Sequence, residues 1–92
     1  MAMKFEWDIK KAGTNLAKHG ITFDEASEVF GDPLAVSIND PDHSEDESRF
    51  VTTGLSRSQH LLVVSHVYRG GTIRIINARS ANNRERKQYE TQ

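Results

Sequence analysis

The sequence predicts a single small α+β domain over residues 1–92, and three observations lead to this prediction. First, 92 residues suffice for one domain with a modest hydrophobic core. Second, helix-like apolar spacing occurs before residue 34 and a possible helix N-cap stands at residue 80, whereas alternating, strand-like segments occupy most of the region between them. Third, short turn-like separators join the later strand-like segments, which favours an antiparallel meander.

The first third of the chain predicts one short strand and two helices. Residues 4–7 alternate in polarity, as in a short edge strand. Asp8 is a suitable N-cap for a helix with one apolar face, and Gly20 is a typical signal for its end. Thr22 and Glu25 have capping-box spacing for a second short helix, which a Gly-Asp-Pro run ends.

The remainder of the chain predicts four strands and a final helix. The strand candidates cover residues 34–38, 48–55, 60–68 and 72–79. Ser80 can cap a helix over residues 81–90, which is polar nearly all round. The expected order is therefore β-α-α-β-β-β-β-α, a small antiparallel sheet with helices packed on one face.

Charge is distributed unevenly, although the formal net charge is only −1. Residues 20–48 contain nine acidic residues and no Lys or Arg, whereas residues 49–89 contain eight basic residues opposed by Glu85 alone. Seven of those eight are arginines, which bind phosphates through paired hydrogen bonds. The pattern favours a nucleic-acid partner for the second half of the chain. The alternative is a dipolar surface whose two halves pair with each other.

Composition and motifs exclude several classes of protein. The chain has no cysteine, which excludes disulfide scaffolds, Cys-ligated zinc and Cys nucleophiles. No apolar run approaches the length of a membrane span and no signal-peptide core is evident, so a cytoplasmic protein is expected. The acidic loop begins like a calcium loop, but Glu45 and Val51 stand where Gly and a bidentate Glu are needed. Nucleotide-binding motifs are also absent, so no cofactor is expected.

The remaining polar residues suit cleavage of RNA without a metal ion. Attack by the ribose 2′-hydroxyl needs a base, an acid at the leaving 5′-oxygen, and cations around the pentavalent phosphate. The candidate catalytic residues are His19, Glu47, Arg49, Arg74, Arg79 and Tyr89, and the candidate RNA-binding residues are Lys18, Arg84, Arg86 and Lys87. Structural roles compete with these functions, because His19 can complement a helix dipole, Glu47 can pair with an arginine, and Tyr89 can anchor the final helix.

The two arginines of the last strand candidate pose a geometric question. Strict alternation along residues 72–79 places Arg74 and Arg79 on opposite faces of the sheet. They can meet one phosphate only if the strand bends, bulges or ends before Arg79. The sequence leaves these alternatives open.

Several segments carry a resemblance to a known family when their order and spacing are considered together. They are Phe5-Glu-Trp-Asp8, Asn15–Gly20, Thr22–Ala26, Val29–Pro33, Glu47-Ser-Arg49, Gly54, Arg74–Arg79, Arg84-Glu85 and Tyr89. With these segments the chain resembles the BrnT family, the toxin half of a bacterial type II toxin–antitoxin pair.

The resemblance implies a RelE-like fold and a ribonuclease that arrests translation. It also implies a hetero-oligomer with a cognate BrnA-type antitoxin that carries a ribbon-helix-helix DNA-binding domain. The complex would repress its own operon, with operator DNA contacted only through the antitoxin.

One position departs from the family pattern, because Asn77 stands where the family usually has a serine. Asn keeps a hydrogen-bonding group but is bulkier and lacks the hydroxyl. The competing class of protein is a non-catalytic module, in which the Arg-rich half binds RNA or an acidic protein and no bond is cut. Formation of 2′,3′-cyclic phosphate ends in EDTA discriminates between the two classes.

Overall fold

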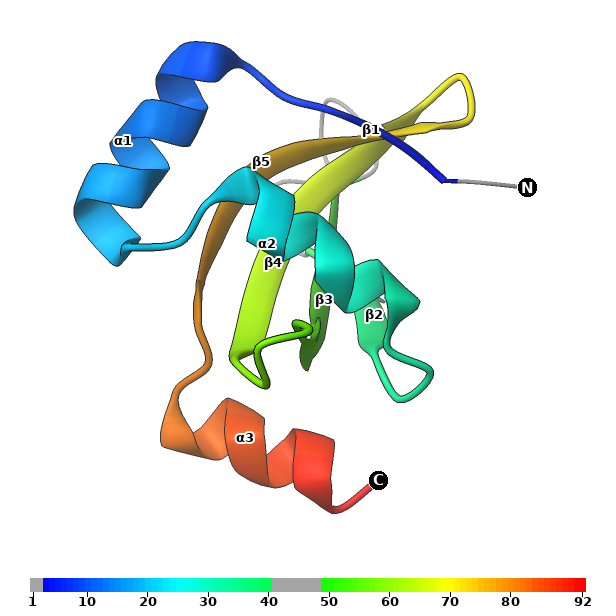
Figure 1. Ribbon diagram of the computed structural model, residues 1–92. Helices are drawn as coiled ribbons and strands as arrows, with labels where there is room; N and C mark the ends of the chain where they lie inside the picture. The colour runs from blue at the N-terminus through cyan, green and yellow to red at the C-terminus, as the bar shows by residue number, and fades with distance from the viewer. Residues whose placement is uncertain (1–2, 41–48) are drawn as a thin grey trace.

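The computed structural model describes residues 3–40 and 49–92 and shows one sheet with helices around it (Figure 1). The elements are β1 (Lys4–Glu6), α1 (Ile9–His19), α2 (Phe23–Ser27), a 3-10 turn η1 (Glu28–Gly31), β2 (Val36–Asn39), β3 (Arg49–Leu55), β4 (Leu61–Arg69), β5 (Thr72–Ser80) and α3 (Asn83–Glu90). The predicted α+β class and the predicted order of elements are confirmed. The candidate residue Glu47 lies outside the described residues.

Both predicted boundary signals of α1 are confirmed. The Asp8 carboxylate accepts hydrogen bonds from the backbone N–H groups of Lys10 and Lys11, at 2.8 and 3.1 Å. These bonds lower the pKa of Asp8. Gly20 adopts a left-handed conformation with φ 71°, and its N–H donates to the Leu16 carbonyl. The chain can therefore turn directly from α1 toward α2.

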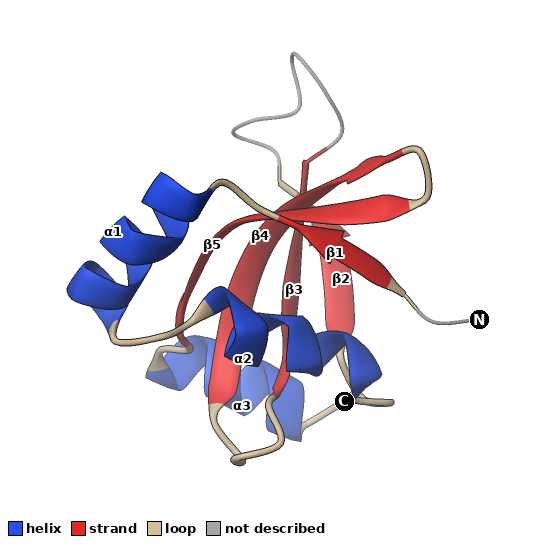
Figure 2. Ribbon diagram, turned by 45° about the horizontal axis from the view of Figure 1, so that its top comes forward, coloured by secondary structure: helices blue, strands red, loops and turns tan. Residues whose placement is uncertain are grey.

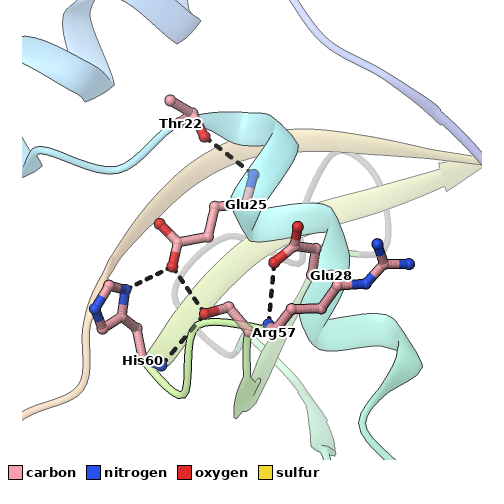
Figure 3. Close-up of polar contacts among 6 residues, drawn as sticks. Thr22, Glu25, Glu28, Arg57 and His60 are labelled. Atoms are coloured by element: carbon pink, nitrogen blue, oxygen red, sulfur yellow. Dashed lines mark hydrogen bonds and ion pairs between the residues drawn. The ribbon is translucent and has the colours of Figure 1, made fainter.

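The capping box predicted for α2 is made only in part. The Thr22 hydroxyl accepts from the Glu25 N–H at 3.0 Å, as expected. Glu25 instead directs its carboxylate to the β3–β4 turn, where Ser56 Oγ and His60 Nδ1 lie 2.8 and 2.7 Å from Oε2 (Figure 3). Burial raises the pKa of Glu25, but these two contacts outweigh it and the net shift is downward. A tertiary contact thus replaces the local one.

Two more carboxylates hold the segment after α2 against the sheet. Glu28 accepts from the backbone N–H of Arg57 at 3.0 Å (Figure 3). Asp32 accepts from Leu34 N–H through one oxygen and from Leu55 N–H through the other. Three described acidic residues of this stretch, Glu25, Glu28 and Asp32, therefore make structural hydrogen bonds.

The sheet has the strand order β1-β5-β4-β3-β2. The predicted meander is confirmed, since β2 to β5 are antiparallel neighbours in chain order. The sheet is nevertheless mixed and not wholly antiparallel, because β1 pairs with β5 in parallel, with Phe5 beside Ile73 and Glu6 beside Arg74. This register lets Phe5 pack against the core that Ile73 borders.

The main core lies between the sheet and α1 and α2. Its buried side chains are Ile21, Phe23, Ala26, Val29, Leu62, Val64, Ile75 and Ala78. His66 is fully buried on the same face of the sheet, with its ring edge-on to Phe30 and Nε2 at 2.7 Å from Thr52 Oγ1. Burial lowers the pKa of His66 to about 4. The imidazole is therefore neutral at physiological pH.

The last helix departs from two expectations. Figure 2 shows α2 in front of the strands and α3 behind their lower ends, so the helices are not all on one face. Tyr89 of α3 lies with Val36 and Ile38, whose side chains project from the face opposite the main core. The cap of α3 is Asn82 and not Ser80, because β5 continues through Ser80 before the helix can begin.

Candidate nucleic-acid interface

A β-bulge in β5 answers the question posed by the two arginines. Ser65 of β4 pairs with Asn77, but the next residue of β4, His66, pairs with Ile75, so Ile76 is an extra residue in β5. The extra residue resets the alternation of side chains. Arg74 and Arg79 therefore project from the same face, the one opposite the main core, which we call the arginine face.

Arg49 shares this face. Arg49 of β3 and Arg74 of β5 both pair with Val67 of β4, so the two arginines flank one valine in a single row across the sheet. At ordinary strand spacing their backbones are roughly 10 Å apart. The Nε of Arg49 is buried and has no hydrogen-bond partner among the described residues. A buried polar atom of this kind points to a ligand or a solvent contact.

The other two arginines form surface ion pairs. Arg74 Nη1 lies 2.7 Å from Glu6 Oε2, and Arg79 makes two contacts of 2.8 Å with the Glu85 carboxylate. The Glu85 hydrogen bonds raise the pKa of Arg79, and those same bonds lower the pKa of Glu85. The arginine side chains remain 30 and 41% exposed. Exposed pairs are weak and exchange partners readily.

A cationic groove of about 290 Å³ lies between α1 and β5, and we call it the α1 groove. Its lining residues are Lys10, Lys11, Thr14, Asn15, Lys18, His19, Ile76 and Asn77. Asn77 belongs to both surfaces, because it also lies on β5 between Arg74 and Arg79. The predicted residues Lys18 and His19 are thereby connected to the arginine face.

Asn15 fixes the position of α1 against β5 at this groove, although the sequence predicts no role for it. It is only 5% exposed, and its side chain bonds to both backbone groups of Ala78 and to the Ile21 carbonyl. A signal was present in the sequence, since Asn15 is one helical turn after Ala12, which packs against the core. A polar residue on the apolar side of a helix requires a buried partner.

Tyr89 lies apart from the α1 groove. Its hydroxyl donates to Asp32 Oδ2 at 2.5 Å, and its ring borders a groove of about 170 Å³ formed with β2 and β3. Burial and the adjacent Asp32 raise the pKa of Tyr89 to about 12. His19 lies beside β5 and Tyr89 beside β2, so the structure does not bring these two candidates together. The other candidates on α3, Arg84, Arg86 and Lys87, are exposed.

Within residues 3–40 and 49–92, no helix is long and apolar enough to cross a membrane. No group of three or more His, Asp or Glu side chains in these ranges is placed to hold a metal ion.

The fold and the site define a small α+β protein whose cationic sheet face suits phosphate binding. Within this class, the chain belongs to the family described as "Ribonuclease toxin, BrnT, of type II toxin-antitoxin system", which matches residues 7–85. The resemblance found in the sequence is thus confirmed. The protein is a ribonuclease toxin of a type II toxin–antitoxin system, a type that implies an antitoxin partner and an RNA substrate.

A solved structure supports this assignment. The crystal structure of the Brucella abortus ribonuclease toxin BrnT superposes with a TM-score of 0.70 and 26% sequence identity, over 89% of this chain and 100% of that chain. A sequence comparison with curated proteins finds no significant match. The fold similarity therefore extends over nearly the whole domain.

Proposed function

We propose that the protein cleaves RNA without a metal ion, through attack of a ribose 2′-hydroxyl on the adjacent phosphorus. An O2′–P bond forms and the P–O5′ bond breaks, which leaves a 2′,3′-cyclic phosphate on one fragment and a 5′-hydroxyl on the other. The proton of the 2′-hydroxyl passes to a base, and an acid protonates the leaving 5′-oxygen.

The observation that carries this proposal is the bulge at Ile76. It places Arg74 and Arg79 on one face, and the sheet register adds Arg49 to the same face. Arg74 and Arg79 pair with Val67 and Val63, which lie four residues apart on β4, so the shared face presents a row of guanidinium groups along an RNA backbone. Such groups can stabilise the negative charge that develops on a pentavalent phosphate. The guanidinium group of arginine stays protonated and positively charged at neutral pH, so arginines can supply positive charge without a metal ion.

The proton-transfer roles differ between the two described candidates. His19 and Asn77 both line the α1 groove, and imidazole is the side chain best suited to accept a proton near neutral pH. We therefore propose His19 as the base. Tyr89 stays protonated because its pKa is raised, and its bond to Asp32 supports an anchoring role. Glu47 remains a candidate from the sequence.

The proposed antitoxin partner is of the BrnA type, with a ribbon-helix-helix domain through which the complex contacts operator DNA and represses its operon. The exposed cationic residues of α3, Arg84, Arg86 and Lys87, support a partner that supplies acidic groups. Arg79 lies next to this helix through its ion pair with Glu85. An antitoxin bound there would cover part of the arginine face.

A direct test is incubation of the purified protein with RNA in EDTA, followed by analysis of the fragment ends. Cyclic phosphate ends are expected, and the R74Q variant should cleave more slowly than the R57Q variant, whose side chain lies in the β3–β4 turn. Loss of cleavage in EDTA with recovery in magnesium or zinc would contradict the metal-free mechanism.

A non-catalytic binding module is the second candidate, and the ion pairs favour it. Arg74 is engaged by Glu6 and Arg79 by Glu85, so both arginines have structural partners in the free protein. On this interpretation the protein binds RNA or an acidic protein through the same face. Saturable RNA binding with no fragments from any RNA would support this second function.

A further inference from the structure

We infer that the α1 groove is a second phosphate-binding subsite, which holds the RNA backbone next to the segment being cleaved. This inference deepens the proposed function and rests on it. It assigns a role to Lys10 and Lys11, which lie outside the set of candidate residues predicted from the sequence. The ligand class is the phosphodiester backbone of single-stranded RNA.

The groove is built by the periodicity of α1. Lys10, Thr14 and Lys18 are four residues apart, as are Lys11, Asn15 and His19. Residues at this spacing form adjacent rows on one side of a helix. Figure 1 shows α1 beside β5, and these residues line the groove together with Ile76 and Asn77 of β5. The bonds between Asn15 and Ala78 fix the distance between helix and strand.

The positions of Lys10 and Lys11 are unusual for a helix. Both lie in the first turn of α1, where the only negative charge is that of the N-cap Asp8, whose carboxylate interacts favourably with Lys11. The helix dipole favours negative side chains at this end, so positive charge there is locally unfavourable. Exceptions to a local stability rule are expected at functional sites. Asp8 is a single carboxylate beside two lysines, so it offsets their charge only in part, and binding of an anion would account for the remaining positive charge.

The lining of the groove specifies an anion of the phosphate class. It contains no Asp or Glu, and the lysine ammonium groups are compact charges suited to phosphate. Thr14 and Asn77 add groups that can meet a ribose 2′-hydroxyl. Asn77 connects the groove to the arginine face, so one RNA strand can follow both surfaces. An acidic protein segment would not require the α1 groove to be connected to the arginine face.

The test measures RNA binding by K10E and K11E with R57E as the matched control. The probe is a short single-stranded 2′-O-methyl RNA, which cannot be cleaved by 2′-hydroxyl attack. Each lysine variant is expected to bind the probe several-fold more weakly, while R57E should bind like the wild type. The slope of log affinity against log salt should become shallower by about 0.7 for each lost phosphate contact.

Stability and charge are controlled separately. The helix dipole favours acidic residues in the first turn, whereas the adjacent Asp8 carboxylate repels them, so these two effects oppose each other in K10E and K11E. Both variants should therefore stay close to the wild-type melting temperature. The variants K10Q and K11Q remove the positive charge without adding a negative one, and should show a smaller loss in the same direction.

Three outcomes are decisive. Equal affinity of K10E, K11E and R57E for the RNA probe overturns the proposed phosphate subsite, because it shows only a diffuse positive charge on the surface. Unchanged RNA binding together with weakened antitoxin binding also overturns it, and assigns the groove to an acidic protein. Failure of the wild type to cleave unmodified RNA defeats the proposed function alone, because the uncleavable probe still reports on the groove.

Discussion

Asn15 pairs with Ala78 as the backbone of a neighbouring strand would. Its Nδ2 donates to the Ala78 carbonyl at 2.9 Å, and its Oδ1 accepts from the Ala78 N–H at 3.0 Å. β1 pairs with β5 only as far as Arg74. Beyond that point, the Asn15 side chain of α1 bonds to the β5 backbone at Ala78. The two Asn15 bonds hold α1 against β5 and so position the α1 groove that lies between them.

Replacing Asn15 with Ala should strongly destabilise the protein. The change leaves the two backbone groups of Ala78 and the Ile21 carbonyl without a partner, all in a buried region. We expect a loss of about 2–4 kcal/mol in the free energy of unfolding, measured with urea. The exposed neighbour Thr14 is the control, and T14A should change stability by less than about 0.5 kcal/mol. Equal effects would show that the Asn15 bonds contribute no net stability.

The pair R79Q and E85Q separates a catalytic from a structural role for Arg79. R79Q should slow RNA cleavage by about 10²-fold or more, as for loss of a group that stabilises a charged transition state. E85Q leaves the guanidinium intact and removes its competing carboxylate, so RNA affinity should be retained or increased. A similar loss of cleavage in both variants would indicate that the ion pair is needed only for structure.

Replacing Tyr89 with Phe should loosen α3. The variant loses the hydrogen bond to Asp32 but keeps the ring against β2 and β3. We expect a loss of about 1 kcal/mol in unfolding free energy and faster hydrogen exchange over residues 83–90. The half-exposed Tyr68 is the matched control, and Y68F should leave both quantities unchanged. A large loss of cleavage in Y89F without faster exchange would assign Tyr89 to catalysis.

Protein stability should fall in acid because of His66. Its pKa is about 4 in the folded protein and 6.5 in its unperturbed state, so below pH 6.5 the unfolded chain binds a proton that the folded chain does not. The unfolding free energy should therefore decrease by about 1.4 kcal/mol per pH unit from about pH 6.5 down to about pH 4. Above pH 6.5 this residue contributes no pH dependence.

The H66Q variant tests this assignment. Gln keeps a polar group toward Thr52 but does not titrate, so the difference between wild type and variant isolates His66. Urea unfolding at several pH values between 4 and 7 gives the two curves. Parallel curves over that range would show that other groups cause the acid instability.

Much of the fold was predictable from the sequence because its signals are local. Asp8 and Gly20 mark the two ends of α1 through hydrogen bonds to residues two to four positions away. The turns between β3, β4 and β5 are short enough to dictate antiparallel pairing. The positive charge of the second half is likewise a property of the sequence itself. These features need no knowledge of what packs against them.

Tertiary structure alone decided where the candidate site residues lie relative to one another. The register between β4 and β5 leaves Ile76 unpaired, and this single extra residue brings Arg74 and Arg79 to one face. Packing also directs Glu25 to Ser56 and His60, and α3 to the face opposite α2. The physical reason is common to these cases: each depends on partners distant in sequence, whose competing hydrogen bonds and buried surfaces outweigh the local pattern.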